Sequence, residues 1–360
     1  MNPGDGLSRL AGSLRVRPAQ RPALLGGRPA LAGRLLRGQP ADAAARHLPL
    51  IYSLCGQAHR LTAELALRAA LHGSAEPDDQ ARQALREEVI REHRRHILLE
   101  WPRLLGGPQS SCALPSPRQA ADLDSWFEGS ANDWLRRWRA DPCQALREWS
   151  VRSRHPLARL LHDCRTRAEA LALPVHALSN APAALREIGL NLGGDEDFLR
   201  HPVLGGEPRE TGAWTRARDA DPTRYNNAWL RLGARLADLV ELSQAQPEPL
   251  TMGALPLGEH QALAWSETAR GLLVHRVQLE SAASGWQICD YRILAPTEWN
   301  LHPRGTLARA LEALPDDAMA RRQAELLLAV FDPCLPYHLE SSMLTPADQT
   351  AHLAGAPGHA

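Results

Sequence analysis

Cys55 and His59 stand four positions apart in the segment SLCGQAH. In a helix this spacing places both side chains on one face, where a thiolate and an imidazole could share a soft metal ion. The alternative is a buried cysteine beside a partly exposed histidine, because such pairs also arise by chance.

A second candidate lies in the segment REHRRH, where Glu92 precedes His93 and His96. The order differs from H-E-x-x-H, so a zinc-protease motif is excluded. Histidines three positions apart on a helix could both contact a buried site. A solvated, charged helix face is the alternative.

Arg270 lies in a third segment, SETARGLLVH, which ends at His275. A buried arginine at the mouth of a strand can donate several fixed hydrogen bonds to an anion. An arginine on the protein surface is the alternative, and the segment alone does not decide between them.

Two proline-containing segments complete the set. Residues 294–305, LAPTEWNLHPRG, predict an ordered irregular segment and by themselves indicate no chemistry. In FDPCLPYH, residues 331–338, Asp332 and Cys334 flank a rigid proline. A turn that ends a helix and buries the cysteine is the alternative to a ligand role.

Helical patterns account for most of the chain and must position these side chains. They predict helices within residues 39–73, 79–105, 119–172, 223–246 and 316–330. Residues 270–294 alternate around a Gly/Ser turn and predict a β-hairpin, and residues 12–18 alternate weakly as a strand would. We expect a mainly α fold with a small β portion (α+β), in a single domain of residues 1–340, followed by a mobile C-terminal tail, residues 341–360.

Composition excludes several classes of protein. The chain has 360 residues, of which 44% are hydrophobic and 23% charged, so we expect it to fold rather than to be disordered. Its formal net charge of zero argues against a nucleic-acid binder. No apolar run approaches the ~20 residues needed to span a bilayer. We find no secretory signal and expect a cytoplasmic protein. The six cysteines include no CxxC pair, which argues against a disulfide framework.

In their order along the chain, the five segments resemble the motifs of [NiFe] hydrogenase large subunits. Those subunits carry R-x-C-G-x-C-x-x-x-H near the start, then D-H-x-x-H, E-A-P-R-G-x-x-x-H and P-x-T-W-N-x-x-P-R-D, and end with D-P-C-x-x-C-x-x-H. The matching positions are Cys55, His59, Glu92 in place of aspartate, His93, His96, Glu267, Arg270, Gly271, His275, Trp299, Asn300, Pro303, Arg304, Asp332, Pro333 and Cys334. The resemblance spans about residues 12 to 338 and implies the large-subunit fold, reduced in size.

Three departures from the motifs restrict what the resemblance implies. Tyr52 and Tyr337 replace two of the four metal-binding cysteines, and Glu340 stands at the closing histidine position. No R-G-x-E segment, which carries the proton-relay glutamate of the family, is found near the start. Nickel in the family is held by four thiolates, so the retained pair implies little nickel binding but leaves two anchors for iron.

The pattern is similar to one branch of the family, the HupK/HoxV-type hydrogenase maturation proteins. The resemblance implies a non-catalytic scaffold or chaperone that transiently holds the Fe(CN)2CO unit on Cys55 and Cys334, without nickel. It implies supporting roles around the metal for His59, Glu92, His93, His96, Arg270, His275 and Asp332. The implied partners are a small cofactor-carrying chaperone, the cyanide and CO assembly complex, and the hydrogenase large subunit.

Two other interpretations stay open. In the first, the chain is a metal-free interaction module, a decayed large subunit that binds maturation proteins or hydrogenase subunits. Alternatively, it is an active enzyme with an unusual metal site, an interpretation against which tyrosine at two ligand positions argues.

Overall fold

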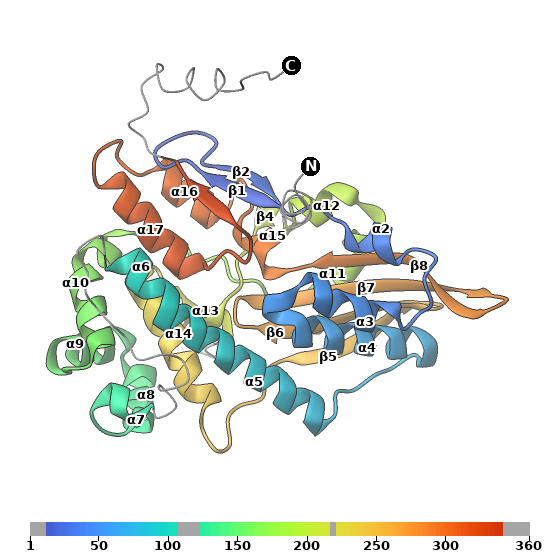
Figure 1. The fold of residues 1–360 in the computed structure, drawn as a ribbon, viewed down its shortest axis with the longest axis horizontal. Helices are drawn as coiled ribbons and strands as arrows, with labels where there is room; N and C mark the ends of the chain where they lie inside the picture. Colours follow the sequence, from blue (N-terminus) through green and yellow to red (C-terminus); the bar gives the residue numbers. More distant parts are fainter. Residues whose placement is uncertain (1–11, 107–122, 217–220, 341–360) are drawn as a thin grey trace, which may run out of the picture.

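The computed structural model describes residues 12–106, 123–216 and 221–340. A layer of helices lies beside an antiparallel sheet, and a small second sheet joins the two ends of the described chain (Figure 1). The expected mainly α fold with a β portion is confirmed. The tail of residues 341–360, for which we expect mobility, lies outside the described residues.

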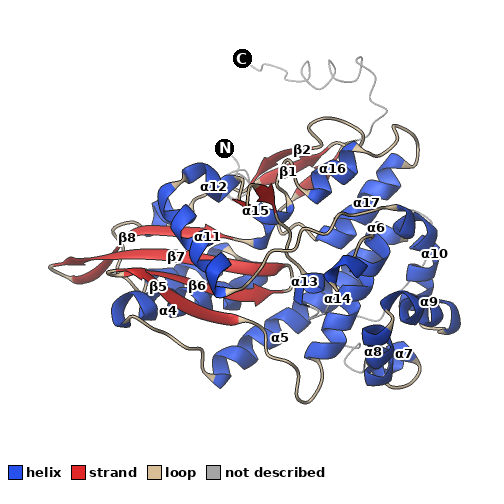
Figure 2. Ribbon diagram, turned by 180° about the vertical axis from the view of Figure 1, so that it is seen from behind, coloured by secondary structure: helices blue, strands red, loops and turns tan. Residues whose placement is uncertain are grey.

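The larger sheet has four antiparallel strands in the order β5-β6-β7-β8. They are β5 (Met252–Gly258), β6 (Gln261–Thr268), β7 (Gly271–Ala282) and β8 (Gly285–Leu294). Helix α4 (Gly56–His72) packs on one face and α11 (Pro182–Gly194) on the other, which buries most of β7 (Figure 2). The predicted hairpin is confirmed as β7 and β8. The sequence analysis did not predict β5 and β6, whose Ala and Gly content lowers β-propensity.

A three-stranded sheet connects the beginning of the described chain with its end. Its order is β2 (Leu24–Gly27), β1 (Ser13–Val16), β9 (Tyr337–Leu339). Strand β1 pairs antiparallel with β2 and parallel with β9, where Leu14 lies opposite Tyr337. This pairing fixes the segment around Cys334 against the N-terminal strands. A separate two-stranded ladder is formed by β3 (Val203–Leu204) and β4 (Glu207–Pro208).

The helical region predicted for residues 39–73 consists of two helices separated by a tight turn. Helix α3 (Ala43–Ile51) ends before Tyr52, a 3-10 turn spans Ser53–Cys55, and α4 begins at Gly56. Gly73 ends α4 in the left-handed conformation, at φ +79°, as its position in the sequence predicts. Cys55 therefore precedes α4, with φ −130°. The expectation that Cys55 and His59 lie on one face of the same helix is wrong, because only His59 belongs to the helix.

The long helix predicted for residues 79–105 is present but interrupted. Helix α5 (Asp79–Arg95) begins after Asp78, whose carboxylate accepts a hydrogen bond of 2.7 Å from the Ala81 amide. One π-helical turn, His96–Glu100, then leads into α6 (Trp101–Leu105). Such turns frequently occur at functional sites, and this one places His96 in the interior.

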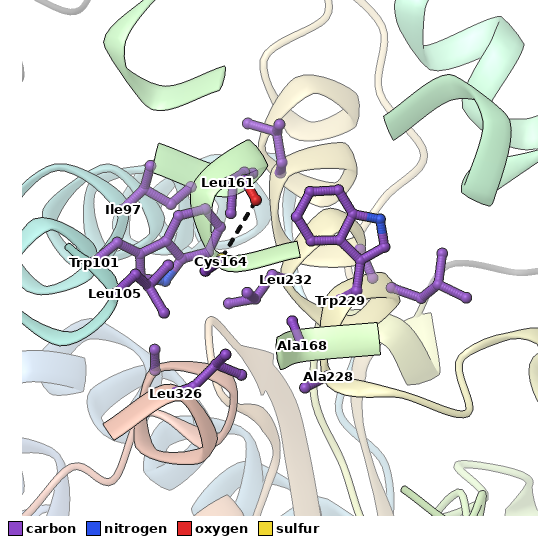
Figure 3. Packing of buried hydrophobic residues seen from close by; sticks show 14 of the residues in the cluster. Ile97, Trp101, Leu105, Leu161, Cys164, Ala168, Ala228, Trp229, Leu232 and Leu326 are labelled. Carbon is purple, nitrogen blue, oxygen red and sulfur yellow. Dashed lines mark hydrogen bonds between the residues drawn. The ribbon is translucent and has the colours of Figure 1, made fainter. Parts of the chain in front are cut away.

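Helix α14 (Ala228–Leu242) lies at the centre of the helical layer. Around it pack α5, α8 (Ala131–Ala140), α9 (Pro142–Arg152), α10 (Pro156–Ala170) and α17 (Ala320–Phe331). Figure 3 shows Trp101 of α6, Cys164 of α10, Trp229 of α14 and Leu326 of α17 packed together in this core. A Cβ atom at Gly233 would lie 2.5 Å from the Trp138 ring, so glycine permits the close approach of α14 and α8.

Short elements complete the described chain. They are α2 (Ala32–Leu36), α7 (Asp124–Phe127), α12 (Glu196–Arg200), α13 (Ala213–Arg216), the 3-10 turn Pro222–Arg224, α15 (Pro296–Asn300) and α16 (Thr306–Glu312). Within the described ranges, no helix has both the length and the apolar character needed to cross a bilayer.

Candidate metal centre

Cys55 and Cys334 come together from distant parts of the chain. Cys334 lies in the turn between α17 and β9. It is close enough to Cys55 for the two sulfurs to interact electrostatically. Part of each residue reaches the surface, yet protein surrounds the Cys55 thiol. This burial raises the pKa of Cys55, and the Cys334 sulfur raises it further. Cys55 is therefore a protonated thiol that must release its proton when it binds a metal.

The position of Cys55 is fixed by Glu88 on α5. The Glu88 carboxylate accepts hydrogen bonds from the backbone amides of Gln57, at 2.7 Å, and Ala58, at 3.0 Å. These amides belong to the first turn of α4, and the N–H groups of a first turn have no acceptor within their own helix. Glu88 thereby joins the start of α4 to α5, next to the thiol.

Two residues that the sequence analysis did not select contact the sulfur of Cys334. Thr297 Oγ1 lies 2.8 Å from it, and Arg28 Nη2 donates a hydrogen bond to it at 3.3 Å. The same Arg28 atom donates to the Cys334 carbonyl oxygen at 2.7 Å. No sequence pattern marks Arg28, whereas Thr297 stands within one of the segments that resemble the hydrogenase motifs.

Arg270 is buried between the two thiols and two carboxylates. It lies in the turn between β6 and β7, with its Nε atom 3.1 Å from Asp332 Oδ2 and its Nη1 atom 3.4 Å from Glu92 Oε2. Burial alone would lower the pKa of Arg270, but Asp332, Cys334, Glu92 and Cys55 raise it on balance. The surface alternative for Arg270 is therefore wrong, and a charged guanidinium lies beside both sulfurs.

Asp332 holds the cations around the centre in place. It follows α17 in the left-handed conformation, at φ +46°, which asparagine and aspartate adopt more readily than most residues. Its carboxylate lies 3.1 Å from Arg270, from Arg235 Nη1 and from His96 Nδ1. Burial would raise the pKa of Asp332, but the nearby arginines and His96 lower it well below its usual range.

A buried hydrogen-bonded chain connects the sheet with α4. His59 Nδ1 lies 3.0 Å from His275 Nε2, and His275 Nδ1 lies 2.7 Å from the Tyr291 hydroxyl. Burial lowers the pKa of both histidines, that of His275 to about 3, so both rings are neutral. The Nε2 atom of His59 is buried without a partner among the described residues.

His93 and His96 are both buried, so the solvated-face alternative is wrong for them. His93 Nε2 donates to Asp238 at 2.6 Å, and Arg235 lies 3.4 Å from its Nδ1 atom. His96 Nε2 lies 2.7 Å from the Ala329 carbonyl oxygen. His96 thus reaches the centre through Asp332, whereas His93 belongs to a neighbouring network around Asp238.

Tyr52 and Tyr337, at the positions of the two missing cysteines, have different surroundings. The Tyr52 ring stacks on His59, with centroids 3.9 Å apart, and the Arg28 guanidinium lies 4.9 Å above it. Burial raises the pKa of Tyr52 to about 12, which keeps its phenol neutral. The Tyr337 hydroxyl instead accepts a hydrogen bond of 2.9 Å from Arg103 on α6.

The donor set of the centre is small. Among the described residues, no group of three or more His, Cys, Asp or Glu side chains is arranged to hold a metal ion. The carboxylates of Glu92 and Asp332 are engaged with arginines. Two sulfurs remain, which fits a metal that arrives with most of its other ligands already bound.

The fold is that of [NiFe] hydrogenase large subunits, in a smaller form. The chain is similar to the reduced Ni-Fe-Se hydrogenase of D. vulgaris Hildenborough, with a TM-score of 0.54 and 17% identity over 86% of this chain and 92% of that chain. It is also similar to an NAD+-reducing [NiFe]-hydrogenase in the H2-reduced state, with a TM-score of 0.51 and 15% identity over 86% and 91% of the two chains.

Sequence comparison gives the family. The chain is 42% identical to the hydrogenase expression/formation protein HoxV of Cupriavidus necator, over 92% of this chain and 96% of that protein. It is 32% identical to HupV of Azotobacter chroococcum and to HupK of Azotobacter vinelandii, in each case over 85% of this chain and 90% of the relative. No family model matches. The chain belongs to the HoxV/HupK/HupV family of hydrogenase expression/formation proteins, which confirms the resemblance found in the sequence.

Proposed function

We propose that this protein is a non-catalytic scaffold in hydrogenase maturation, which transiently holds an iron ion carrying two cyanides and one CO on Cys55 and Cys334. The observation that carries the proposal is the pair of thiols beside the buried guanidinium of Arg270. Its relatives are named hydrogenase expression/formation proteins, which supports a role in assembly rather than in hydrogen turnover.

The number of ligands supports iron in this form. Three diatomic ligands and the sulfurs of Cys55 and Cys334 fill five positions around a six-coordinate iron. One position then stays open for exchange, as a transient carrier requires. Soft thiolates suit such an iron, and the chain need supply no further donor.

Arg270 is suited to a cyanide nitrogen. Its Nη1 and Nη2 atoms lie 3.4 Å from Glu92 Oε2, long for a charge-assisted hydrogen bond, so a cyanide can take over these donors. Asp332 fixes the opposite edge of the guanidinium through Nε. Glu92 and Asp332 thus act as positioning residues for Arg270 rather than as metal ligands.

The two tyrosines argue against nickel. Tyr52 carries a phenol whose pKa is about 12, and a neutral phenol is a poor substitute for a thiolate. The hydroxyl of Tyr337 is engaged with Arg103. Nickel would therefore have two sulfurs in place of the four that hold it in the hydrogenases.

Transient holding implies a donor and an acceptor of the iron unit. We expect a small cofactor-carrying chaperone and the cyanide and CO assembly complex on the donor side, and the hydrogenase large subunit on the acceptor side. These partners rest on the family membership and not on a contact in the structure.

Infrared spectroscopy tests the proposal directly. Protein purified anaerobically from hydrogenase-producing cells is expected to show cyanide and CO stretching bands. The bands should be absent from Cys55→Ala and Cys334→Ala and retained in Cys289→Ala, a half-buried cysteine on β8 that is the matched control. Metal analysis of the same samples should find iron and little nickel.

Hydrogenase activity in cells provides the opposing outcome. If a Cys55→Ala/Cys334→Ala double variant supports full hydrogenase activity, the scaffold role is wrong and a metal-free interaction module takes its place. Circular dichroism and thermal unfolding of the variant must match the parent protein, so that loss of fold is not mistaken for loss of iron.

A further inference from the structure

A cavity of about 710 Å³ is lined by Arg28 and Thr297, the two residues that contact the Cys334 sulfur. Its walls come from β2, the loop before α2, the ends of α12 and β8, and α15. Ala30, Arg34 and Arg200 on its lining are exposed, whereas Tyr52 and Thr297 are buried. The cavity thus extends from the surface to the interior, and its volume is within the range of ligand-binding pockets.

The inner end of the cavity adjoins the candidate metal centre. Arg28 and Thr297 both line the cavity, and both contact the Cys334 sulfur, at 3.3 and 2.8 Å. Neither Cys334 nor Cys55 is itself among the lining residues. A group that reaches the inner end of the cavity therefore meets Arg28 and Thr297, which lie directly against the Cys334 sulfur.

The charge of the lining favours anions. Arg28, Arg34 and Arg200 line the cavity, against a single carboxylate, that of Glu298. Glu298 is occupied as a cap of α15, where it accepts a hydrogen bond of 2.8 Å from the Ala295 amide. Within the described part of the chain, Arg34 and Arg200 form no salt bridge, so their charges face the cavity and its mouth.

Arg28 links the cavity to the sulfur. Its Nη2 atom donates to the Cys334 sulfur and carbonyl oxygen, and its guanidinium lies over the Tyr52 ring. The described residues offer no hydrogen-bond acceptor to its Nε and Nη1 atoms. An anionic ligand at the inner end of the cavity can therefore bind these donors while it remains next to the sulfur.

We propose that this cavity is the entrance through which the iron unit reaches the centre, and that Arg28 is the residue that first binds it. The inference rests on the proposed function. The Fe(CN)2CO unit bound to a carrier thiolate is an anion, because two cyanides balance the charge of Fe(II) and the thiolate adds one negative charge. Three arginines along the route attract this anion and lower the desolvation penalty as it leaves water.

Transfer is a ligand exchange at iron without a change of oxidation state. A bond forms between iron and the Cys334 sulfur, and the bond between iron and the carrier sulfur breaks. If Cys334 enters as a thiol, its proton passes to the departing carrier sulfur. Cys55 then binds at an open position of the iron, and its proton is released to water. The expected partner is a protein segment that presents the iron on a cysteine and is narrow enough to enter the cavity.

Thiol alkylation of the metal-free, full-length protein tests the entrance separately from iron binding. Iodoacetate and iodoacetamide form the same type of S–C bond and release iodide, but only the first reagent is an anion. Mass spectrometry gives the rate of reaction at Cys334 for each reagent. Cys289 is the internal reference, because its charged neighbours are of both signs, Glu280 and Asp290 against Arg37 and Arg276. The ratio of the two rates removes differences in the intrinsic reactivity of the sulfur.

We expect the iodoacetate to iodoacetamide ratio to be at least threefold higher at Cys334 than at Cys289. Arg28→Gln should lower the ratio at Cys334 at least threefold, whereas Arg46→Gln, a surface change on α3, should leave it unchanged. Ala30→Trp narrows the opening of the cavity. It should slow the alkylation of Cys334 by both reagents at least fivefold, without effect on the alkylation of Cys289. The proposal would be overturned if Arg28→Gln left the iodoacetate to iodoacetamide ratio at Cys334 unchanged, or if Cys334 reacted at the parent rate in Ala30→Trp.

The infrared and alkylation results can fail independently. Normal cyanide and CO bands with unchanged alkylation in both variants would leave the scaffold role intact and place the entrance elsewhere. The expected alkylation pattern without any infrared bands would refute the scaffold role, while the cavity would still be an anion-selective route to Cys334. Loss of the infrared bands in Ala30→Trp, with Cys289 unaffected, is the result expected if both proposals hold.

Discussion

The Nδ1 atom of His59 and the Nε2 atom of His275 lie 3.0 Å apart between α4 and β7. Only one of two neutral rings can donate in this contact, so the direction of the chain depends on Tyr291 at its far end. If the Tyr291 hydroxyl donates to His275 Nδ1, His275 donates to His59, and within these three side chains every polar proton but one has an acceptor. The exception is the proton on His59 Nε2, on the ring that stacks against Tyr52.

Tyr291→Phe tests how much this buried chain contributes to stability. It removes the donor to His275 and leaves a buried nitrogen without a partner, so we expect the free energy of unfolding to fall by about 1–3 kcal/mol. Urea unfolding followed by circular dichroism measures the change. Tyr337→Phe, which removes a partly exposed bond to Arg103, is the matched control and should stay within about 0.5 kcal/mol of the parent. Equal effects of the two substitutions would show that the buried chain contributes no more to stability than the partly exposed bond does.

Buried neutral histidines predict sensitivity to acid. Burial lowers the pKa of His93 to about 4 and of His275 to about 3, below the value of about 6.5 expected in the unfolded chain. The unfolded state therefore binds protons that the folded state does not, and stability is complete above pH 6.5 and falls as the pH drops below it. As the pH falls, each histidine lowers the free energy of unfolding by about 1.4 kcal/mol per pH unit, until the pH reaches its pKa in the folded protein.

Urea unfolding between pH 7.5 and 4.5 measures this slope. In His275→Asn the slope below pH 6 should decrease by about 1.4 kcal/mol per pH unit, because one titrating group is removed. His47→Asn, at an exposed position on α3, should not change it. A slope that is the same in His275→Asn and in the parent protein would show that His275 is protonated in the folded state.

Local features of the fold were predictable from sequence, because the forces that produce them act over a few residues. Gly73 ends α4 because glycine adopts the left-handed conformation without strain, and the alternation in residues 270–294 produces the β7–β8 hairpin. The break at Tyr52 was not predictable in this way. Helical periodicity continues across it, and the break arises where the chain passes the centre.

The contacts at the centre join residues that are far apart in sequence. Arg28 and Cys334 are separated by 306 positions, and His59 and His275 by 216. The order of the motifs selected Cys55, Arg270 and Cys334, because a family resemblance carries information on tertiary structure that periodicity lacks. Arg28 lies outside every motif, so its role depends on the pairing of β1 with β9, which no local pattern encodes.

Asp332→Asn should be among the most destabilising substitutions in the chain. Asparagine has nearly the same shape and tolerates the left-handed conformation at this position, so only the charge is lost. Arg270 and Arg235 would then be buried without their carboxylate, which predicts a loss of about 3–5 kcal/mol in the free energy of unfolding. Glu312→Gln, which removes a surface pair with Arg21, serves as control and should change it by less than about 1 kcal/mol. Similar values for both would show that the buried network is not essential.

Retention of residues 341–360 is a further expectation. In the hydrogenase family, removal of a C-terminal peptide follows nickel insertion and occurs just after the closing histidine, where this chain has Glu340. The Glu340 carboxylate lies 3.7 Å from Arg15 and 3.6 Å from Arg17, on β1 and just after it. We expect intact-mass measurement, on protein from cells with active hydrogenase, to give the full-length chain. A mass that ends near residue 340 would contradict the expectation.

The different surroundings of Tyr52 and Tyr337 predict unequal effects when each is changed to cysteine. Tyr52 lies beside His59 and Arg28, next to both thiols, so Tyr52→Cys adds a third sulfur at the centre. The side chain of Tyr337 reaches Arg103 instead. We expect Tyr52→Cys to lower the dissociation constant for Co2+ on the order of tenfold or more, about 1.4 kcal/mol, and Tyr337→Cys to change it less than about threefold.

The sulfur-to-cobalt charge-transfer absorption, titrated anaerobically in the metal-free protein, measures these constants. Tyr52→Ala removes the same ring without adding a sulfur, and therefore separates ligand gain from relief of crowding around Cys55. An increase in affinity shared by Tyr52→Ala and Tyr52→Cys would assign the gain to space rather than to coordination. A larger gain from Tyr337→Cys than from Tyr52→Cys would mean that β9 moves towards the thiols on metal binding, because only then does a sulfur at position 337 reach the metal.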